Sequence, residues 1–162
     1  MVDAETGIAV CATVIALVSL WISLVQTKAA REHNRQSVRP LLQIRRIKDD
    51  VAGLEIINAG LGPAIVTKTL VTFDGENVGA WDLETYHRVT RSFPFRPKVM
   101  TLVEGQALIP GQKRYLLHVD GFKVDEHNWF WELISQRMLI EVRYESLYGG
   151  EDFSVRLSVL QE

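Results

Sequence analysis

The residues able to do chemistry in this sequence are few and scattered. The four histidines are His33, His87, His118 and His127, and no two have the spacing of a metal-ligand pair. The sequence contains no G-x-S-x-G, H-E-x-x-H or G-x-G-x-x-G motif. We therefore expect a protein that is not an enzyme and that uses no metal or cofactor.

Other titratable side chains lie within strand-like patterns: one histidine, and one cluster of two glutamates and an arginine. His118 follows apolar residues in YLLHVD and is predicted to be a half-buried structural histidine. Glu141 and Glu145 flank Arg143 in another strand pattern, which favours cross-strand ion pairs over an acid–base couple.

The segment from Tyr86 to Met100 is the best candidate for a binding site. It reads YHRVTRSFPFRPKVM, in which Arg88, Arg91 and Arg96 alternate with aromatic side chains and prolines. Arginines beside aromatic residues can bind a phosphate-bearing ligand, an anionic lipid or a partner protein. The alternative is a solvated loop whose aromatic side chains pack into the core.

A membrane-spanning helix is predicted near the N-terminus. Residues 7–26 read GIAVCATVIALVSLWISLVQ, without one charged side chain. At 1.5 Å per residue, this run covers about the 30 Å hydrocarbon core of a bilayer. Residues 1–6 form a short acidic tail, which argues against a secretory signal peptide.

Charge is distributed unevenly along the chain, although the formal net charge is only −2. Residues 27–48 contain seven Lys or Arg and one Glu, whereas Asp3 and Glu5 precede the apolar run. A basic block beside a membrane segment marks its cytoplasmic side and is not a specific nucleic-acid site. The sequence therefore predicts a single-pass protein with its N-terminus outside and its large domain in the cytoplasm.

Small residues form a stripe along the predicted membrane helix. Ala12, Ala16, Ser19 and Ser23 are spaced by helical turns, so they share one face. Such a face lets two helices approach closely in lipid and would support a homo-oligomer. The alternative is that small residues are simply common in membrane helices.

The rest of the chain is predicted to be a stalk followed by a β domain. Residues 27–38 are helix formers, and Pro40 ends the stalk. In residues 39–162 apolar runs alternate with turn signals. The expected strands are 41–48, 53–58, 64–73, 76–78, 107–109, 112–119, 137–147 and 152–160. Residues 79–97 are expected to form a long loop with room for a short helix.

The expected fold is an antiparallel, Ig-like β-sandwich or a partly closed β-barrel with one short helix. That helix is predicted over residues 128–136, with Asn128 as its N-cap. A tight turn is expected at Asp74–Gly75, and a hairpin around Gly149 and Gly150.

The segment from Asn58 to Ala64 (NAGLGPA) is predicted to be a structural turn. Gly60 and Gly62 are expected to take positive φ, Pro63 to fix the exit of the chain, and the Asn58 side chain to cap backbone groups. The functional alternative is an anion-binding concavity made by its exposed N–H groups.

Three segments resemble those of a family of small bacterial single-pass membrane proteins with a cytosolic β domain. They are EHNRQSVRP (residues 32–40), NAGLGPA (residues 58–64) and YESLYG (residues 144–149). The resemblance covers nearly the whole chain. It implies this architecture and a place in the bacterial inner (cytoplasmic) membrane, but no activity, because the family is uncharacterised.

Two functions follow as hypotheses. The first is a non-enzymatic interaction protein or scaffold that docks a partner protein or self-associates through its helix in the lipid bilayer. The second is an effector whose β domain senses a small anionic signal, for example a nucleotide, and acts through the membrane helix. A core filled by side chains favours the first, and a polar cavity reached by the three arginines favours the second.

Overall fold

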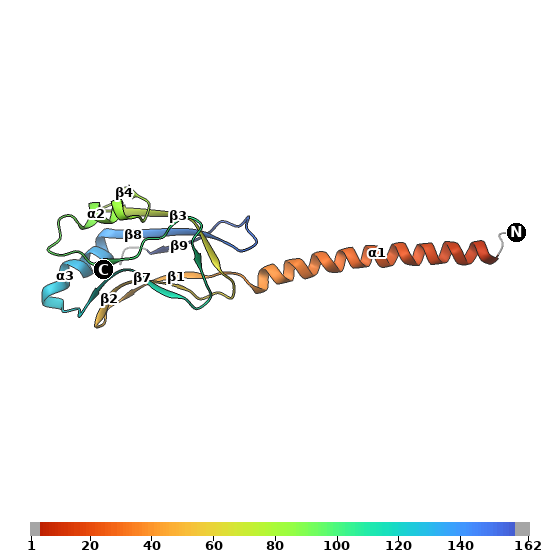
Figure 1. The fold of residues 1–162 in the computed structure, drawn as a ribbon, viewed down its shortest axis with the longest axis horizontal. Helices are drawn as coiled ribbons and strands as arrows, with labels where there is room; N and C mark the ends of the chain where they lie inside the picture. Colours follow the sequence, from red (N-terminus) through yellow and green to blue (C-terminus); the bar gives the residue numbers. More distant parts are fainter. Residues whose placement is uncertain (1–3, 158–162) are drawn as a thin grey trace. The chain divides into compact units, whose positions relative to one another are not determined.

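The computed structural model describes the backbone of residues 4–157 and the side chains of residues 7–30 and 37–157. The chain divides into two compact units, Met1–Ser37 and Val38–Glu162 (Figure 1). The side chain of His33, and the last predicted strand beyond residue 157, lie outside the described residues. The first unit is helical, and the described strands belong to the second.

The first unit is one helix, α1 (Ala4–Ser37). Within it, the segment Gly7–Ala30 is long and apolar enough to cross a membrane, and none of it is buried. The hydroxyl groups of Thr13 and Thr27 each donate to the carbonyl oxygen four residues earlier, at 2.8 Å. These bonds satisfy two polar side chains without water. A signal sequence near an N-terminus meets the same criteria of length and apolar composition.

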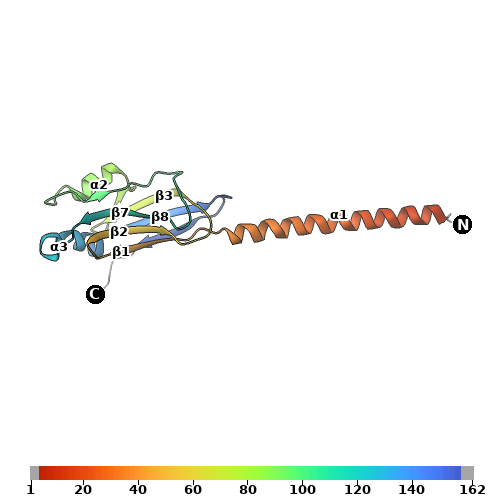
Figure 2. The ribbon, with the colours of Figure 1, turned by 60° about the horizontal axis from the view of Figure 1, so that its bottom comes forward.

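The second unit contains two antiparallel sheets that do not close into a barrel (Figures 1 and 2). One has the strand order β1-β2-β7-β5; the other has the order β4-β3-β8-β9, with β6 paired to β3. The strands are β1 Leu42–Ile47, β2 Val51–Asn58, β3 Ala64–Phe73, β4 Glu76–Gly79, β5 Lys98–Val99, β6 Ala107–Leu108, β7 Lys113–Asp120, β8 Met138–Ser146 and β9 Phe153–Leu157. The predicted mainly antiparallel β domain is confirmed, in its open two-sheet form.

The inner faces of the two sheets form one apolar core. Alternate residues of β8 are buried from Met138 to Ser146, as the two-residue period of a strand requires. The other sheet contributes Leu54 and Ile56, which are fully buried. Side chains therefore fill the space between the sheets.

Two short helices and a π-helical turn connect the strands, where the sequence predicts one helix. The helix α2 (Leu83–Thr90) begins at Asp82, whose carboxylate accepts a hydrogen bond from the backbone N–H of Thr85 at 2.8 Å. The helix α3 (Val124–Glu132) continues into the π-helical turn η1 (Leu133–Arg137).

The predicted start of the second helix at Asn128 is wrong. The structure begins α3 at Val124, and Asn128 lies inside it. The N-cap is Lys123, whose backbone N–H donates to Nδ1 of His127 at 2.9 Å. A side chain from the first turn thus reaches back to the cap, a role that Glu or Gln usually fills, so the sequence signal is weak.

The two predicted tight turns contain glycines with positive φ. Asp74 and Gly75 have φ of 50° and 86°, which is the turn expected between β3 and β4. Gly149 and Gly150 also have positive φ and turn β8 into β9. Both hairpins are confirmed.

Asn58 is the centre of the turn between β2 and β3. Its side chain is fully buried. Its Oδ1 accepts from the backbone N–H of Leu41 at 3.2 Å and of Gly60 at 3.0 Å. Its Nδ2 donates to the carbonyl oxygens of Gly62 and Leu108, each at 2.8 Å. One side chain therefore joins three segments that are far apart in sequence.

The expectation that Gly60 and Gly62 take positive φ is wrong. Neither is among the positive-φ residues of the described chain. Both are required by close packing instead, because a Cβ at Gly60 would overlap the backbone nitrogen of Leu41 and one at Gly62 would overlap the carbonyl oxygen of Val38. The constraint comes from a distant segment, which a reading of the local sequence does not include.

Candidate functional site

The three predicted binding arginines do not line one site. Arg88, on α2, pairs with Glu84 at 3.0 Å and donates to the carbonyl oxygen of Val78 at 3.1 Å. Arg91 is the exposed C-cap of the same helix. Only Arg96 lines one of the two hollows described below.

The aromatic side chains between these arginines pack against α3. Phe93 stacks on Trp129 with ring centroids 4.8 Å apart. The ring of Phe95 is nearly perpendicular to those of Trp129 and His127, with centroids 5.1 and 5.2 Å apart. These aromatic side chains therefore anchor the loop to α3. This agrees with the structural alternative for that part of the sequence.

Different polar side chains gather around β7, and a β-bulge brings two of them, Tyr115 and His118, together. The pairing of β7 with β2 shifts register once, so that Leu116 has no opposite partner. Leu116 and Leu117 are consequently both buried in the core. Tyr115 and His118 then lie on the same exposed face, with ring centroids 5.1 Å apart.

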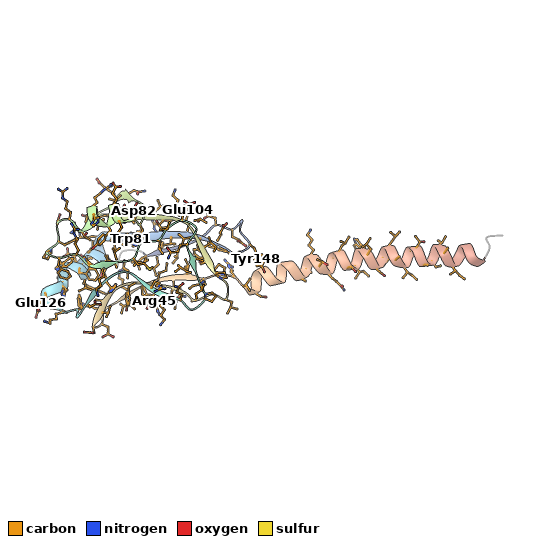
Figure 3. All side chains as sticks on the ribbon, viewed as in Figure 1. Arg45, Trp81, Asp82, Glu104, Glu126 and Tyr148 are labelled. Atoms are coloured by element: carbon orange, nitrogen blue, oxygen red, sulfur yellow. The ribbon has the colours of Figure 1, made fainter. Side chains whose placement is uncertain are left out.

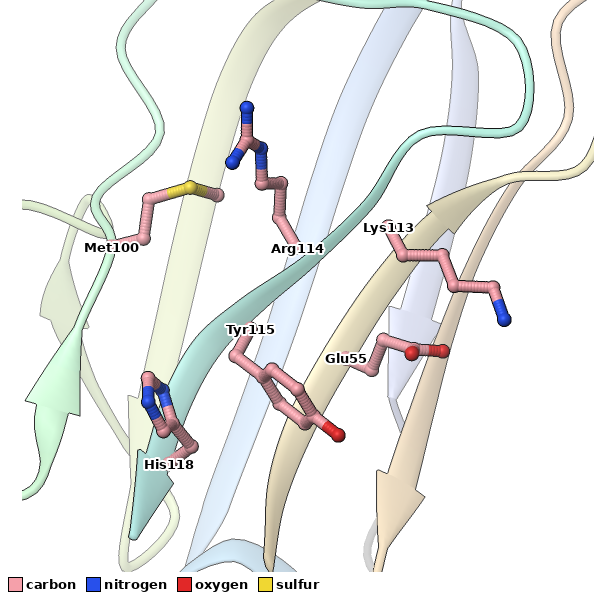
Figure 4. A pocket seen from close by; sticks show the side chains of 6 residues that line it. All are labelled: Glu55, Met100, Lys113, Arg114, Tyr115 and His118. Atoms are coloured by element: carbon pink, nitrogen blue, oxygen red, sulfur yellow. The ribbon is translucent and has the colours of Figure 1, made fainter. Parts of the chain in front are cut away.

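A hollow of about 300 Å³ opens on this face (Figure 4). In Figure 4, Arg114 and Met100 face each other across one part of it, and the Tyr115 ring lies between His118 and Glu55. The lining residues are Glu55, Met100, Lys113, Arg114, Tyr115 and His118. They come from β2, from β7 and from the residue that follows β5.

A second hollow, of about 280 Å³, shares one wall with the first. His118 lines both of them. The remaining lining residues are Phe95, Arg96, Pro97, Lys98, Val119, Asp120 and His127. The two hollows together make one surface, which we call the β7 face.

The β7 face carries a surplus of positive charge. Its four basic residues outnumber Glu55 and Asp120, and both carboxylates already have cationic partners. Glu55 pairs with Arg45 and Asp120 with Lys98, each at 2.5 Å. The remaining basic residues are exposed and form no ion pair within the described residues; they are Arg96, Lys113 and Arg114.

His118 lines both hollows, and its surroundings disfavour the protonated form of the ring. Burial lowers its pKa below the usual value, and Lys98 acts in the same direction, while Asp120 opposes the shift. Its Nε2 lies 3.6 Å from Oδ1 of Asp120. Its buried Nδ1 has no hydrogen-bond partner within the described residues. The predicted half-buried histidine therefore lies on the wall that the two hollows share.

Neither hollow has the donor set of a metal centre. The described residues contain no group of three or more His, Cys, Asp or Glu side chains placed to hold a metal ion. His87 packs beside the ring of Tyr86, and His127 caps α3. Glu141 accepts from Arg143 on its own strand at 3.1 Å and lies 3.8 Å from Arg156 across the strand pair, so Glu141 forms ion pairs. Glu145 instead accepts from the backbone N–H of Gly150 at 3.1 Å.

A family comparison covers both units of the chain. The family model described as Domain of unknown function (DUF8453) matches residues 7–160. The chain belongs to this family. The match spans the apolar helix and the β domain, so the two units are parts of one DUF8453 architecture. No curated protein matches the chain.

The β7 face of this DUF8453 protein was missed by sequence reasoning for a local reason. In an unbroken strand, Tyr115 and His118 would point to opposite sides, because they are three residues apart. Two adjacent leucines before His118, in YLLHVD, are the signal that a bulge turns both inward. The exposed Lys113 and Arg114 do not belong to any sequence motif that would indicate a binding site.

Proposed function

We propose that this DUF8453 protein is a membrane-anchored, non-enzymatic binding module of the bacterial inner membrane, and that its cytoplasmic β domain docks a partner protein. The β7 face carries the proposal. It joins two hollows of about 300 and 280 Å³ with three basic side chains that have no ionic partner among the described residues.

Anchoring and orientation rest on the helix and its flanks. The segment Gly7–Ala30 is long and apolar enough to cross a membrane. Seven basic residues follow the apolar run within residues 27–48, whereas Asp3 and Glu5 precede it. A stretch rich in Lys and Arg stays on the cytoplasmic side. The β domain, which follows that stretch, is therefore cytoplasmic.

The residue types on the β7 face fit an acidic segment of a partner protein. Arg, Tyr and Met are enriched in protein interfaces, and Arg114, Tyr115 and Met100 line the same hollow. The unpaired basic side chains attract carboxylates and can form charge-assisted hydrogen bonds with them. Because the two hollows share His118, an extended segment can lie across both with His118 beneath it.

Site-specific photocrosslinking in cells tests this proposal. A photoreactive amino acid replaces Lys113 in the full-length protein, and Leu83, an exposed residue of α2, in the control. The expected result is one discrete adduct from position 113 whose crosslinked peptide is rich in Asp and Glu. Arg96→Glu and Arg114→Glu should each reduce that adduct strongly, because they reverse charges beside the segment.

Two results would contradict the docking function. The first is equal crosslinking from positions 113 and 83, which would mean that the contacts are not specific to the β7 face. The second is an adduct unaffected by Arg114→Glu but lost in Arg91→Glu, which would move the site to the end of α2. Circular dichroism of each variant controls for folding.

A small anionic ligand is the second candidate, and one observation favours it. The ring of Tyr115 lies in the same hollow as Lys113 and Arg114, so a nucleobase can stack while a phosphate meets the cations. Thermal shift assays with a panel of nucleotides test this. A stabilising nucleotide whose effect disappears in Arg114→Ser but persists in Arg91→Ser would support sensing. If no nucleotide of the panel raises the melting temperature, the sensing function is contradicted and the docking function is retained.

A further inference from the structure

Exposed apolar side chains cluster at the end of the β domain where the chain enters it. Leu61 is 76% exposed, Leu147 70%, Ile109 59% and Leu41 50%. Figures 1 and 3 show the β2–β3 turn and the β8–β9 hairpin at this end of the domain, and Figure 3 places Glu126 at the other. We call these four side chains the apolar tips.

Backbone contacts bring the four segments together. The backbone N–H of Leu61 donates to the carbonyl oxygen of Arg39 at 3.2 Å. Ala64, which follows the same turn, pairs with Leu108 on one side and Ser146 on the other. Ile109 and Leu147 directly follow those two partners in the chain. The apolar tips therefore surround the point at which Val38 begins the domain.

The apolar tips are held on rigid supports. The buried Asn58 bonds the backbone of one tip, Leu41, and of the residues that adjoin two others, Gly60, Gly62 and Leu108. Ser146, before Leu147, donates its hydroxyl to Glu151 at 2.8 Å. Exposed apolar side chains on fixed loops cannot fold back onto the domain. Their surface therefore remains free to contact another molecule or a membrane.

The charged groups around the apolar tips have partners within the domain, which lowers the cost of moving them close to the membrane. Arg39 is exposed, and its guanidinium lies over the ring of Phe153, 4.6 Å from the centroid. Glu145 accepts from the backbone N–H of Gly150 at 3.1 Å, and Glu151 accepts from Ser146. Both carboxylates thus have partners within the hairpin.

The length of chain before the domain keeps the domain close to the membrane surface. α1 continues beyond the uncharged run of residues 7–26 through residues 27–37, which as a helix add about 16 Å. The polar headgroup layer on each side of a bilayer is about 5–8 Å thick. Val38 is therefore held no more than about 10 Å beyond the headgroups, and tilting of α1 lowers the tips around it towards them.

We propose that the β domain docks on the lipid surface through the apolar tips, which insert between the headgroups of the bilayer that holds α1. The proposal rests on membrane anchoring by α1. It adds that the domain is fixed on the membrane in one orientation and does not hang free on its stalk. Amphipathic surfaces bind the interface in this way, with apolar side chains among the headgroups and basic ones beside them.

Lipid quenching of single-cysteine labels tests the docking. The full-length protein, with Cys11→Ser, is reconstituted in vesicles of phosphatidylethanolamine and phosphatidylglycerol. An environment-sensitive fluorophore is attached at Leu61→Cys or Leu147→Cys. The matched control is Val124→Cys, an equally exposed apolar position on α3 (54%) at the other end of the domain. Ile15→Cys, in the candidate span, reports anchoring. For positions 61, 147 and 124 the quencher is a lipid with a nitroxide near the glycerol. For position 15, near the centre of the span, it is a lipid with a nitroxide near the end of an acyl chain.

Labels at positions 61 and 147 are expected to show blue-shifted emission and quenching several times greater than the label at 124. Adding Leu147→Asp should reduce the quenching at 61, because a charge resists insertion, while thermal stability stays unchanged. Quenching at 15 with values at 61 and 147 equal to that at 124 would overturn the docking and leave the anchor intact. No quenching at 15 would overturn the anchor itself. Self-quenching at 61 without lipid quenching would make a second copy the occupant and also overturn the docking.

Discussion

Replacing Asn58 tests how the end of the domain that receives the chain is held together. Asn58→Ala removes four hydrogen bonds at once. Those to the carbonyl oxygens of Gly62 and Leu108 are buried, while those from Leu41 and Gly60 are partly buried, so water can replace them. A buried polar group without a partner costs about 1–3 kcal/mol. The two carbonyls and the lost packing together predict a loss of about 3–5 kcal/mol, a large part of the stability of a small domain.

Asn58→Asp is a more specific test of the same hydrogen bonds. It preserves the shape of the side chain but replaces the N–H donor with a carboxylate oxygen. The carboxylate keeps the two acceptor bonds from Leu41 and Gly60, but it turns an oxygen towards the carbonyl oxygens of Gly62 and Leu108. Burial and this repulsion both raise the pKa of the new carboxyl above its unfolded value. The folded state then binds more protons than the unfolded state, so the unfolding free energy falls as pH rises from about 4 through the folded pKa. The slope is at most about 1.4 kcal/mol per pH unit.

Urea unfolding of residues 38–162 measures both variants, with the emission of Trp81, Trp129 and Trp131 as the reporter. The control is Asn77→Asp, on the exposed β3–β4 hairpin, where the side chain only accepts from the N–H of Gly79 and the carboxylate keeps that bond. The control should match the wild type at every pH. Stabilities of Asn58→Asp that do not vary with pH, or a loss under about 1 kcal/mol in Asn58→Ala, would refute the reasoning.

Four other predictions follow from the fold and the anchor. Gly62→Ala should cost about 2–4 kcal/mol in urea unfolding, because its Cβ overlaps the carbonyl oxygen of Val38, whereas Leu61→Ala next to it should change stability by less than about 0.5 kcal/mol. Burial lowers the pKa of His118, so the stability that its neutral ring contributes is complete above about pH 6.5 and is lost as pH falls towards the folded pKa. His118→Gln should flatten this acid-side loss. A C-terminal alkaline phosphatase fusion should be inactive and a fluorescent cytosolic reporter bright, and the reverse would show that the domain is outside. Ala16→Leu should weaken self-association of α1 in a membrane dimerisation reporter, and Val14→Leu should not.

The sequence was sufficient for features that depend on local pattern. The uncharged run from Gly7 to Gln26 predicts a membrane-length helix, and α1 contains it. The alternating residues of β3 and β8 predict strands whose inner residues are buried, as they are. Local chemistry also gave the turn at Asp74–Gly75, because positive φ at both positions is a property of the turn itself.

Features that depend on distant segments were not predictable in the same way. The bulge that exposes Tyr115 beside His118 exists only in the pairing of β7 with β2. Gly60 and Gly62 are constrained by residues 38–41 and not by their own φ. β5 has only two residues, and no period can be detected over that length. The candidate site was missed for this reason, since most of its residues gain their positions from long-range pairing.

The β7 face lies a short distance along β2 from the apolar tips, which limits what partner the domain can receive. Asn58 ends β2 and exchanges backbone hydrogen bonds with the turn before β7, donating to Gln112 and accepting from Gly111. Glu55 and Lys113, on the first hollow, are only a few residues from that junction. At about 3.3 Å per residue, three residues of β2 place the hollow roughly 10 Å from Asn58. A domain docked by its tips would therefore hold the hollow just above the headgroups. An acidic segment that binds there must approach along an anionic surface, which repels it, so a partner tethered to the same membrane has the advantage of high local concentration.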